Sequence, residues 1–444
     1  MIFANWILPS IRRKVFWYID RCKGRPIRQA YNDIKDLYYS DSNSFVLLKK
    51  QKTAIEELIR HATDTTEFYK DLSGKIQLQE FPVINKHIVK GNSVKFTSKL
   101  YFNKKTYEMH TSGSTGTPFK VIQNNEKKKR VYAEVIFFSE LSGYRVGNHL
   151  IFLRAMTKHS NKSKLKQIMQ NESLIDISKL DDLHIGKVID QIRNINKKNS
   201  LVLAYASTYD SIKDFYSRKN LSFQDKDNFC GIISSSETLF SETRELVSKI
   251  FNAQVFNRYS NQENGIIAQD CPGYEDHFVI NESSYFIEIL SLEKDIPVPE
   301  GEVGRIVVTD LYNYAMPLIR YDTGDIGSFG TVEINGIKKK VIKQLMGRKV
   351  DLIYDTSGNK LSPHIITNIF WRYSTLSQFQ FIQRTERHYH IKLNSHSLFD
   401  EEELVSTLFG VLGANAEFSI EYVDEIPILS SGKRNYIINE TVSG

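Results

Sequence analysis

Residues 111–118 read TSGSTGTP, and the first seven positions hold five hydroxyl side chains and two glycines. This composition does not suit the interior of a helix or a strand, because Ser and Thr compete for backbone hydrogen bonds and glycine favours turns. Glycine also lets several N–H groups converge on one anion, to which hydroxyl groups add neutral donors. No Gly-Lys-Ser/Thr follows, which excludes a Walker A loop. The stretch therefore predicts a phosphate-binding loop, although taken alone it also fits an ordinary surface loop.

The flanks of this stretch predict an α/β domain. Residues 107–110 and 119–122 are predicted to be short strands, and residues 47–72 and 126–142 amphipathic helices. Short apolar runs then alternate with helical segments, which indicates parallel sheet content. The runs lie at 149–155, 201–207, 230–236 and 253–260, with a helix at 187–195. After Cys271 the pattern becomes β, with strands at 285–290 and 304–310 and a hairpin at 330–345 that turns at Asn335-Gly336.

The last hundred residues predict a separate small α+β domain. It holds a hairpin at 352–361, strands at 378–383, 388–393 and 417–422, and a helix at 399–410. We expect the boundary near Gly347, which gives domains at 1–346 and 347–444, with residues 1–45 as a helical extension. A length of 444 residues is consistent with one large domain and one small domain.

Composition and net charge limit the classes of protein and of ligand that fit this sequence. Hydrophobic residues make up 41% and charged residues 25% of the chain, which are values of a globular protein. The 59 basic and 52 acidic residues leave a net charge of +7, which favours anionic ligands but is far from the charge density of nucleic-acid-binding proteins. Three scattered cysteines without a CxxC pair argue against disulfides and closed zinc sites, so a cytoplasmic location is expected. Cys271 and His277 supply two soft ligands where structural zinc needs four, so we expect a turn there.

The N-terminal sequence MIFANWILPSIRRKVFWYIDRCKGR (residues 1–25) allows two interpretations. Its apolar run is too short to span a bilayer, and its positive charge follows the run, unlike that of a secretory signal. Its apolar residues either pack onto the main domain or contact a membrane surface, with Arg and Lys facing anionic head groups. Helical apolar spacing is more often core, which favours packing.

Five motifs occur in one order along the chain: TSGSTGTP (111–118), YSNQE (259–263), RYDTGDIG (320–327), MGRKVDLI (346–353) and SSGKRNYII (430–438). With this order the sequence resembles the adenylate-forming superfamily, and within it the phenylacetate–CoA ligase-like branch that includes CapK-type proteins of capsular polysaccharide clusters. The resemblance implies a large adenylation domain with mixed sheets flanked by helices, and a small α+β domain on a hinge. It also implies ATP and Mg²⁺ as ligands, with CoA as a further one.

The resemblance assigns nucleotide contacts to the first three motifs. The side chains and amides of the first motif would hold the β- and γ-phosphates; they are Thr111, Ser112, Gly113, Ser114, Thr115 and Gly116. Tyr259 would stack on adenine, Glu263 would hold magnesium and take part in catalysis, and Asp325 would bind the ribose hydroxyls. Ser260 replaces the glycine usual in the second motif, which alters how the backbone passes the nucleotide.

The last two motifs are assigned to the hinge and to catalysis. Arg348 would lie near the ribose or phosphate, and Val350 replaces the acid that many relatives carry at the hinge. Lys433 would reach the α-phosphate and neutralise it during attack. A looser match places Glu237 in an adenine loop, and the AYASTYD stretch (204–210) in the acyl pocket, with Tyr205, Ala206, Ser207 and Tyr209.

The function implied is ATP-dependent activation of a carboxylic acid to an acyl-adenylate with pyrophosphate release. The acceptor expected from the family is the CoA thiol. The alternatives are transfer of an acyl or aminoacyl group to a sugar in surface-polysaccharide synthesis, and a nucleotide-binding accessory protein without catalysis. The expected partners are a small carboxylate and a nucleotide, without nucleic acid. An association with the inner face of the membrane or with a polysaccharide-assembly complex is the further alternative.

Overall fold

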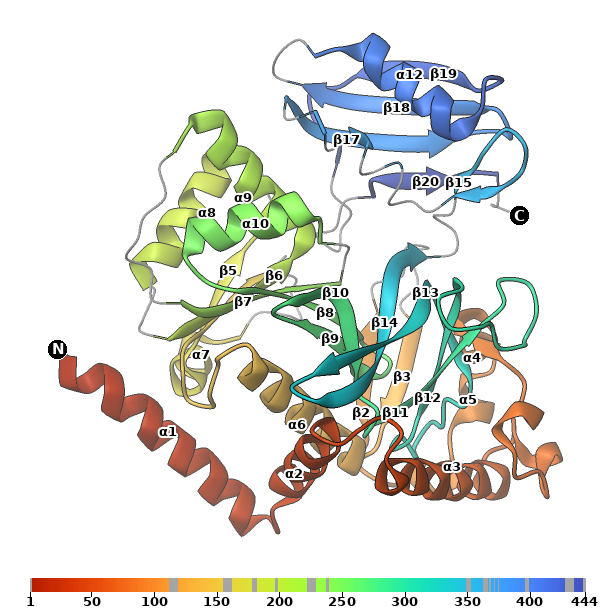
Figure 1. The fold of residues 1–444 in the computed structure, drawn as a ribbon. Helices are drawn as coiled ribbons and strands as arrows, with labels where there is room; N and C mark the ends of the chain where they lie inside the picture. Colours follow the sequence, from red (N-terminus) through yellow and green to blue (C-terminus); the bar gives the residue numbers. More distant parts are fainter. Residues whose placement is uncertain are drawn as a thin grey trace. The chain divides into compact units, whose positions relative to one another are not determined.

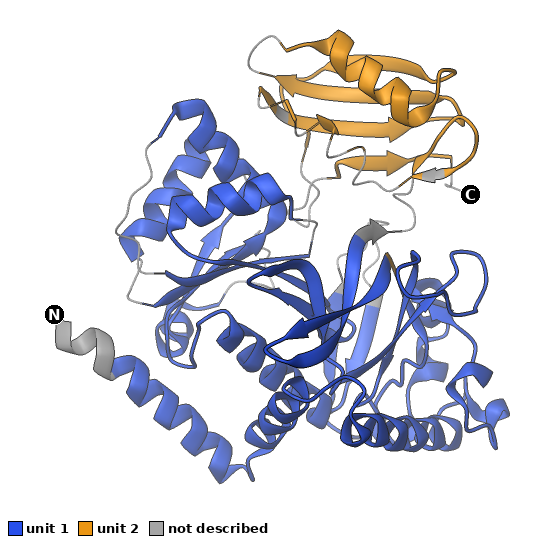
Figure 2. Cartoon of the chain, viewed as in Figure 1, with its two compact units in different colours: residues 1–323, 327–345 blue, residues 324–326, 346–444 orange. Residues whose placement is uncertain are grey.

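The computed structural model describes residues 2–111, 119–154, 162–177, 182–195, 199–221, 229–236, 239–348, 353–361, 366, 369–370, 372–373, 375–395, 399–427 and 435–441. The chain forms two compact units (Figure 2). Unit 1 comprises residues 1–323 and 327–345, and unit 2 comprises residues 324–326 and 346–444. No helix in the described parts has the length and apolar character needed to cross a bilayer.

Unit 1 is built around one large mixed sheet (Figure 1). Among the described residues its strand order is β11-β12-β13-β14-β10-β9-β8-β7-β6-β4-β5, and β1 pairs with β13. The bounds are β1 (Ile84–Asn85), β4 (Leu150–Arg154), β5 (Glu172–Asp176), β6 (Ser200–Tyr205), β7 (Phe229–Ser235), β8 (Val255–Asn261), β9 (Gly265–Cys271), β10 (Tyr274–Ile280), β11 (Tyr285–Leu290), β12 (Gly304–Asp310), β13 (Tyr321–Ile334) and β14 (Ile337–Arg348). Strands β4 to β8 pair in parallel, whereas β8, β9, β10 and β14 pair antiparallel.

Helices connect the parallel strands, as the alternating sequence pattern predicted. The helices of unit 1 are α1 (Ile2–Cys22), α2 (Pro26–Tyr38), α3 (Phe45–Thr65), α4 (Lys86–Gly91), α5 (Ser93–Phe96), α6 (Asn125–Leu141), α7 (Lys164–Gln170), α8 (Asp182–Ile195), α9 (Ala206–Lys219) and α10 (Ser241–Phe251), with 3-10 turns at Lys70–Leu72, Leu78–Glu80 and Lys99–Tyr101. A separate hairpin, β2 (Tyr107–Thr111) and β3 (Phe119–Gln123), flanks residues 112–118. The predicted mixed α/β architecture is confirmed.

One helix prediction was too long. The sequence predicted a helix over 47–72, but α3 ends at Thr65, and Thr66 has an extended backbone with φ −112° and ψ 148°. Threonine hydroxyls in this segment bond helix carbonyls, Thr65 to His61 O and Thr66 to Ala62 O, and Thr66 Oγ1 also accepts from Tyr69 N. These side-chain bonds compete with further helical bonds and end the helix.

The β13–β14 hairpin confirms the predicted turn. Asn335 and Gly336 connect the two strands with φ values of 51° and 78°. Two consecutive positive φ angles give the twist that a tight hairpin needs, and Asn-Gly adopts them at little cost.

In the part of unit 2 that the structure describes, a four-stranded sheet in the order β19-β18-β17-β20 is accompanied by a small hairpin and the helix α12. Its elements are β15 (Ile353–Tyr354), β16 (Lys360–Leu361), β17 (Leu376–Gln383), β18 (His388–Ser395), α12 (Glu401–Leu412), β19 (Glu417–Tyr422) and β20 (Ile437–Asn439). Helix α12 begins at the cap Asp400, whose side chain accepts from Glu403 N, and it buries Leu404, Leu408 and Leu412. The small α+β unit is therefore as the sequence predicted.

The close packing of two backbone segments leads to a testable prediction for Gly231. A Cβ atom on Gly231 in β7 would lie 2.2 Å from the carbonyl oxygen of Ser142, directly after α6. We expect Gly231→Ala to lower the free energy of unfolding by about 1–3 kcal/mol, because two backbone segments must separate. Urea denaturation measures this. Gly91→Ala is the matched control, since nothing lies within 4 Å of its added Cβ; equal stability of both variants would contradict the packing.

Candidate functional site

The second motif lies at the turn between β8 and β9. Tyr259 is in the last part of β8, and Glu263 lies in the turn that leads to Gly265 at the start of β9. Both side chains are largely buried, each with 8% of its surface exposed. The antiparallel pairing of Asn261 with Gly265 closes the turn, and Asn264 N donates to Asn261 Oδ1 over 2.8 Å. The turn therefore holds the Glu263 carboxylate at a defined place on the sheet.

The start of β13 contacts both motif residues. The Tyr321 hydroxyl donates to Glu263 Oε1 over 3.4 Å, and the Tyr259 hydroxyl donates to Thr323 Oγ1 over 3.2 Å. Thr323 Oγ1 in turn donates to Ile306 O over 3.0 Å. Tyr321 and Thr323 share one face of an extended strand because they are two positions apart. The structure thus joins YSNQE to RYDTGDIG, which are about sixty positions apart in the sequence.

The hairpin of the first motif reaches the same turn. Gln123, at the end of β3, donates through Nε2 to the backbone oxygen of Glu263 over 3.4 Å. Strands β2 and β3 are paired as far as Thr111 and Phe119, directly beside residues 112–118. The backbone of Thr111 belongs to β2, whereas Ser112, Gly113, Ser114, Thr115 and Gly116 lie outside the described residues.

A buried polar network from α6 lies behind the turn. Lys127 forms an ion pair with Asp310 (2.7 Å), both side chains being fully buried, and donates to the Tyr285 hydroxyl over 3.0 Å. That hydroxyl lies 2.9 Å from the backbone oxygen of Asn264 and 3.0 Å from Glu134 Oε2. Burial raises the pKa of Glu134, although the positive charges of Lys127 and Arg130 oppose this. The burial of the charges on this helix was not among the predictions made from the sequence.

Gly265 is required where this network meets the turn. Its φ is 136°, and an added Cβ would lie 2.5 Å from Glu134 Oε2 and 2.7 Å from the Tyr285 hydroxyl oxygen. Glu134 Oε2 also accepts a hydrogen bond from Ile266 N over 3.2 Å. The backbone on both sides of Gly265 is thus held by buried polar groups, and only glycine leaves room for them.

Arg320 anchors the start of β13. Its guanidinium donates to both oxygens of Glu288 over 3.0 and 3.1 Å and to Phe81 O over 3.0 Å, and its side chain is 4% exposed. Its backbone adopts a φ of 53°, unusual for a residue with a side chain. The bidentate pair, which needs the planar fork of arginine, fixes the residue directly before Tyr321.

For the other predicted site residues, the structure gives the position in the fold or does not describe the residue. Asp325 lies in β13 directly after Gly324, whose φ is 82°, and the backbone of Arg348 is the last residue of β14. Glu237 and Lys433 lie outside the described residues, as does Val350. The predicted pocket residue Tyr209 is instead a core residue: its side chain is fully buried, and its hydroxyl donates to Ile233 O over 3.2 Å.

The donor set at Glu263 fits a hard cation. A carboxylate oxygen is the protein ligand that Mg²⁺ prefers, and Mg²⁺ commonly takes its remaining ligands from phosphates and water. Within the described ranges, no group of three or more His, Cys, Asp or Glu side chains could enclose a metal. Cys271 ends β9 directly before the β9–β10 turn, where Gly273 has a φ of 81°, and His277 lies within β10. This agrees with the turn expected there.

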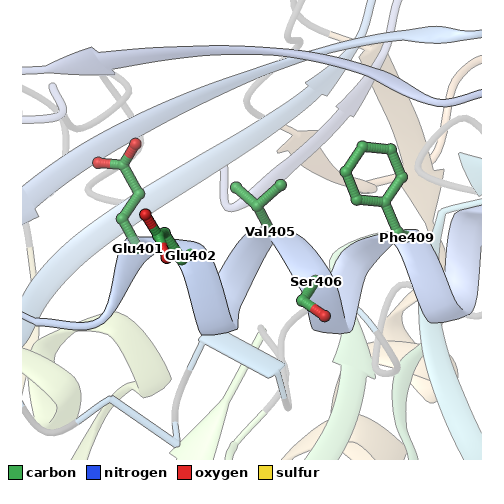
Figure 3. A pocket seen from close by; sticks show the side chains of 5 residues that line it. All are labelled: Glu401, Glu402, Val405, Ser406 and Phe409. Carbon is green, nitrogen blue, oxygen red and sulfur yellow. The ribbon is translucent and has the colours of Figure 1, made fainter.

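Two surface hollows occur away from these residues. One, of about 340 Å³, lies along α12 and is lined by Glu401, Glu402, Val405, Ser406 and Phe409; Val405 and Phe409 point to the same side of the helix (Figure 3). The other, of about 540 Å³, lies between α3 and residues 311–314 and includes Phe45, Lys49 and Tyr312. Neither contains Tyr259, Glu263 or Asp325, so the candidate site rests on the convergence of motifs.

Comparison with known proteins shows what this chain resembles. Residues 353–440 match the CapK C-terminal domain. The whole chain is similar to Protein CapK of Staphylococcus aureus, with 25% identity over 461 aligned positions that cover 99% of this chain and 97% of CapK. The fold is similar to the crystal structure of 2-hydroxyisobutyryl-CoA ligase in the postadenylation state, with a TM-score of 0.70 and 14% identity over 88% of this chain and 89% of the ligase. The chain is a homologue of CapK along its full length, with the fold of acyl-CoA ligases that form acyl-adenylates.

A shorter match relates part of this CapK homologue to a CoA ligase. It is 29% identical to phenylacetate-coenzyme A ligase of Thermus thermophilus over 133 residues, which are 30% of this chain and 26% of the ligase. The resemblance predicted from five ordered motifs is therefore confirmed in the similarity to CapK, in the shorter match to a CoA ligase and in the fold. A shared fold does not define the acid or the acceptor, because one fold serves many substrates.

The buried Arg320–Glu288 pair predicts a stability effect. We expect Arg320→Met to lower the free energy of unfolding by about 3 kcal/mol or more, because it leaves the Glu288 carboxylate buried without its partner. The double variant Arg320→Met/Glu288→Leu should recover much of this loss. Thermal and urea denaturation measure both.

The matched control is Lys120→Met, which breaks the exposed Lys120–Glu108 pair (2.9 Å) and should cost at most about 1 kcal/mol. A loss for Arg320→Met no larger than that of the control, or no recovery in the double variant, would contradict the anchoring role.

Proposed function

We propose that this CapK homologue activates a carboxylic acid with ATP, forms an acyl-adenylate and releases pyrophosphate, and then transfers the acyl group to an acceptor. The observation that carries the proposal is the meeting of two motifs at Glu263, whose carboxylate accepts from Tyr321, and the contact of its backbone oxygen with Gln123 of the hairpin that flanks the first motif. The superfamily, and the likeness to a ligase crystallised after adenylation, support the same reaction class.

In the first step the substrate carboxylate oxygen attacks the α-phosphorus of ATP. The new O–P bond forms as the bond to the bridging oxygen of the β-phosphate breaks, and pyrophosphate leaves. Both reactants are anions, so fixed donors must stabilise the charge that develops. We assign the hydroxyl and amide groups of residues 111–116 to the β- and γ-phosphates and Lys433 to the α-phosphate. Magnesium at Glu263 would supply further charge neutralisation.

The nucleoside contacts are assigned to Tyr259 and Asp325, and a looser sequence match adds Glu237. The bond from the Tyr259 hydroxyl to Thr323 fixes the orientation of its ring before any ligand arrives. With 8% of its surface exposed, the side chain can offer adenine only part of its ring. Asp325 would accept hydrogen bonds from both ribose hydroxyls, and Arg348 would lie near the ribose or phosphate.

In the second step the acceptor attacks the acyl carbon and AMP leaves. We favour the CoA thiol as acceptor, because the two related ligases named above act with CoA by name. A sugar hydroxyl or amine is the alternative, favoured by the similarity to CapK along the whole chain and by Val350 at the position of the usual hinge acid. Product analysis with and without CoA separates the two acceptors.

The reaction predicts ATP–pyrophosphate exchange that depends on a carboxylic acid. Across a panel of carboxylic and amino acids, we expect exchange with at least one acid, and hydroxamate formation when hydroxylamine traps the adenylate. Nucleotide binding without exchange for any acid would favour an accessory protein, and no nucleotide binding at all would refute the proposal.

Variants of the two proposed charged groups should reduce this exchange without unfolding the chain. Glu263→Gln and Lys433→Ala should each lower the exchange rate on the order of a hundredfold, since each removes charge stabilisation from the transition state. The controls are Glu302→Gln and Lys249→Ala, both at exposed positions of unit 1. Wild-type exchange rates for Glu263→Gln and Lys433→Ala would exclude the assigned roles.

A further inference from the structure

The net positive charge of the chain arises from two short segments. Residues 8–25 and 162–170 together hold nine of the 59 basic residues and one of the 52 acidic residues. Removing them from the count leaves 50 basic and 51 acidic residues, so the rest of the chain is nearly neutral. The single acid, Asp20, is buried, and its carboxylate accepts from Ile27 N and Arg28 N at the start of α2.

One face of helix α1 packs against the rest of unit 1. Arg13 Nε donates to Val146 O over 3.0 Å, and Phe16 and Trp17 pack against the cluster that includes Tyr31 and Phe137. The backbone of α1 passes very close to Gly147, where an added Cβ would lie 2.3 Å from Pro9 O. Phe16 therefore packs as the sequence predicted. The same packing was predicted for Leu8, Ile11, Val15 and Tyr18, and it is wrong for them, because they lie on the exposed face of the helix.

The opposite face of α1 is apolar and exposed. Its residues recur at intervals of three, four and one, as on one side of a helix, and each is roughly half exposed or more. They are Leu8 (48%), Ile11 (48%), Val15 (50%), Tyr18 (67%) and Ile19 (47%). Lys14 and Arg21 are exposed on the same helix. An apolar face bordered by basic residues is not explained by packing within the unit.

Helix α7 repeats the pattern beside α1 (Figure 1). Leu165, Ile168 and Met169 are 69%, 66% and 70% exposed, and Lys164 and Lys166 are exposed on either side of Leu165 in the sequence. Arg12 of α1 donates to Ile168 O over 3.5 Å, which places the two helices next to each other. Asn171, after α7, donates to Gly147 O over 3.0 Å and so ties α7 to the loop that α1 crosses. We call residues 8–25 and 162–170 the α1–α7 surface.

We propose that the α1–α7 surface docks on an anionic lipid bilayer. Exposed apolar side chains beside lysine and arginine suit the boundary between head groups and acyl chains, where burial and charge attraction act together. A second copy of this chain is a poorer occupant, because a symmetric contact would bring two strongly basic surfaces together. The phosphates of a nucleic acid would be attracted to the basic residues, but a nucleic acid would leave the apolar face of α1 exposed.

Vesicle flotation of the full chain tests this proposal. We expect binding to vesicles of phosphatidylcholine with phosphatidylglycerol, weak binding to phosphatidylcholine alone, and loss of binding at high salt. The charge variant (Lys14→Gln/Arg21→Gln/Lys164→Gln/Lys166→Gln) and the apolar variant (Leu8→Ser/Ile11→Ser/Val15→Ser/Ile168→Ser) should each bind at least about tenfold more weakly. Unchanged circular dichroism and ATP–pyrophosphate exchange would show that both variants are folded.

The matched control is Ile76→Ser/Val94→Ser/Lys99→Gln, which removes exposed apolar and basic side chains elsewhere in unit 1. It should bind as the wild type does. Three outcomes would overturn the proposal: no flotation of the wild type, equal losses in the control and the two variants, or a wild-type dimer in light scattering that only the apolar variant dissociates. The last outcome would identify a second copy as the occupant.

Discussion

The ion pair between Arg320 and Glu288 fixes the backbone from which the candidate site is built. Both side chains are buried, and the guanidinium also donates to Phe81 O, so Arg320 keeps a left-handed backbone at the start of β13. The next residues, Tyr321 and Thr323, contact Glu263 and Tyr259. A buried bidentate pair is geometrically strict, and a rigid strand start is what a site for two anionic reactants requires.

Most of the fold could be predicted because its elements have strong local signals. Asn335-Gly336 specifies the β13–β14 turn through its positive φ angles, and α12 follows from its acidic cap and apolar spacing. The end of α3 was missed because helical periodicity continues past Thr65, while the threonine hydroxyls that end the helix act through local backbone bonds. The strand order, in which β14 lies between β13 and β10, depends on long-range pairing that no local pattern encodes.

The motifs led to a prediction of the candidate site residues, but not of the residues that hold them in place. The motif order pointed to Glu263, Tyr259 and Asp325. The supporting roles of Tyr321, Thr323 and Gln123 were not predicted and were identified from their contacts in the structure. The largest omission is a buried one: the sequence analysis did not single out Lys127 and Glu134 of α6, yet both are fully buried, and Lys127 pairs with Asp310. Their spacing of seven positions on one helical face was the available signal. Conversely, Tyr209 had the sequence context of a pocket residue but packs in the core.

The central claim is that the β8–β9 turn, the start of β13 and the hairpin beside residues 112–118 form one nucleotide site. A crystal structure of the full chain with Mg²⁺ and a non-hydrolysable α,β-methylene analogue of ATP tests this most directly. The account predicts the base next to Tyr259 and the metal at the Glu263 carboxylate. A nucleotide bound away from both residues, or no bound nucleotide at saturating concentration, would contradict it.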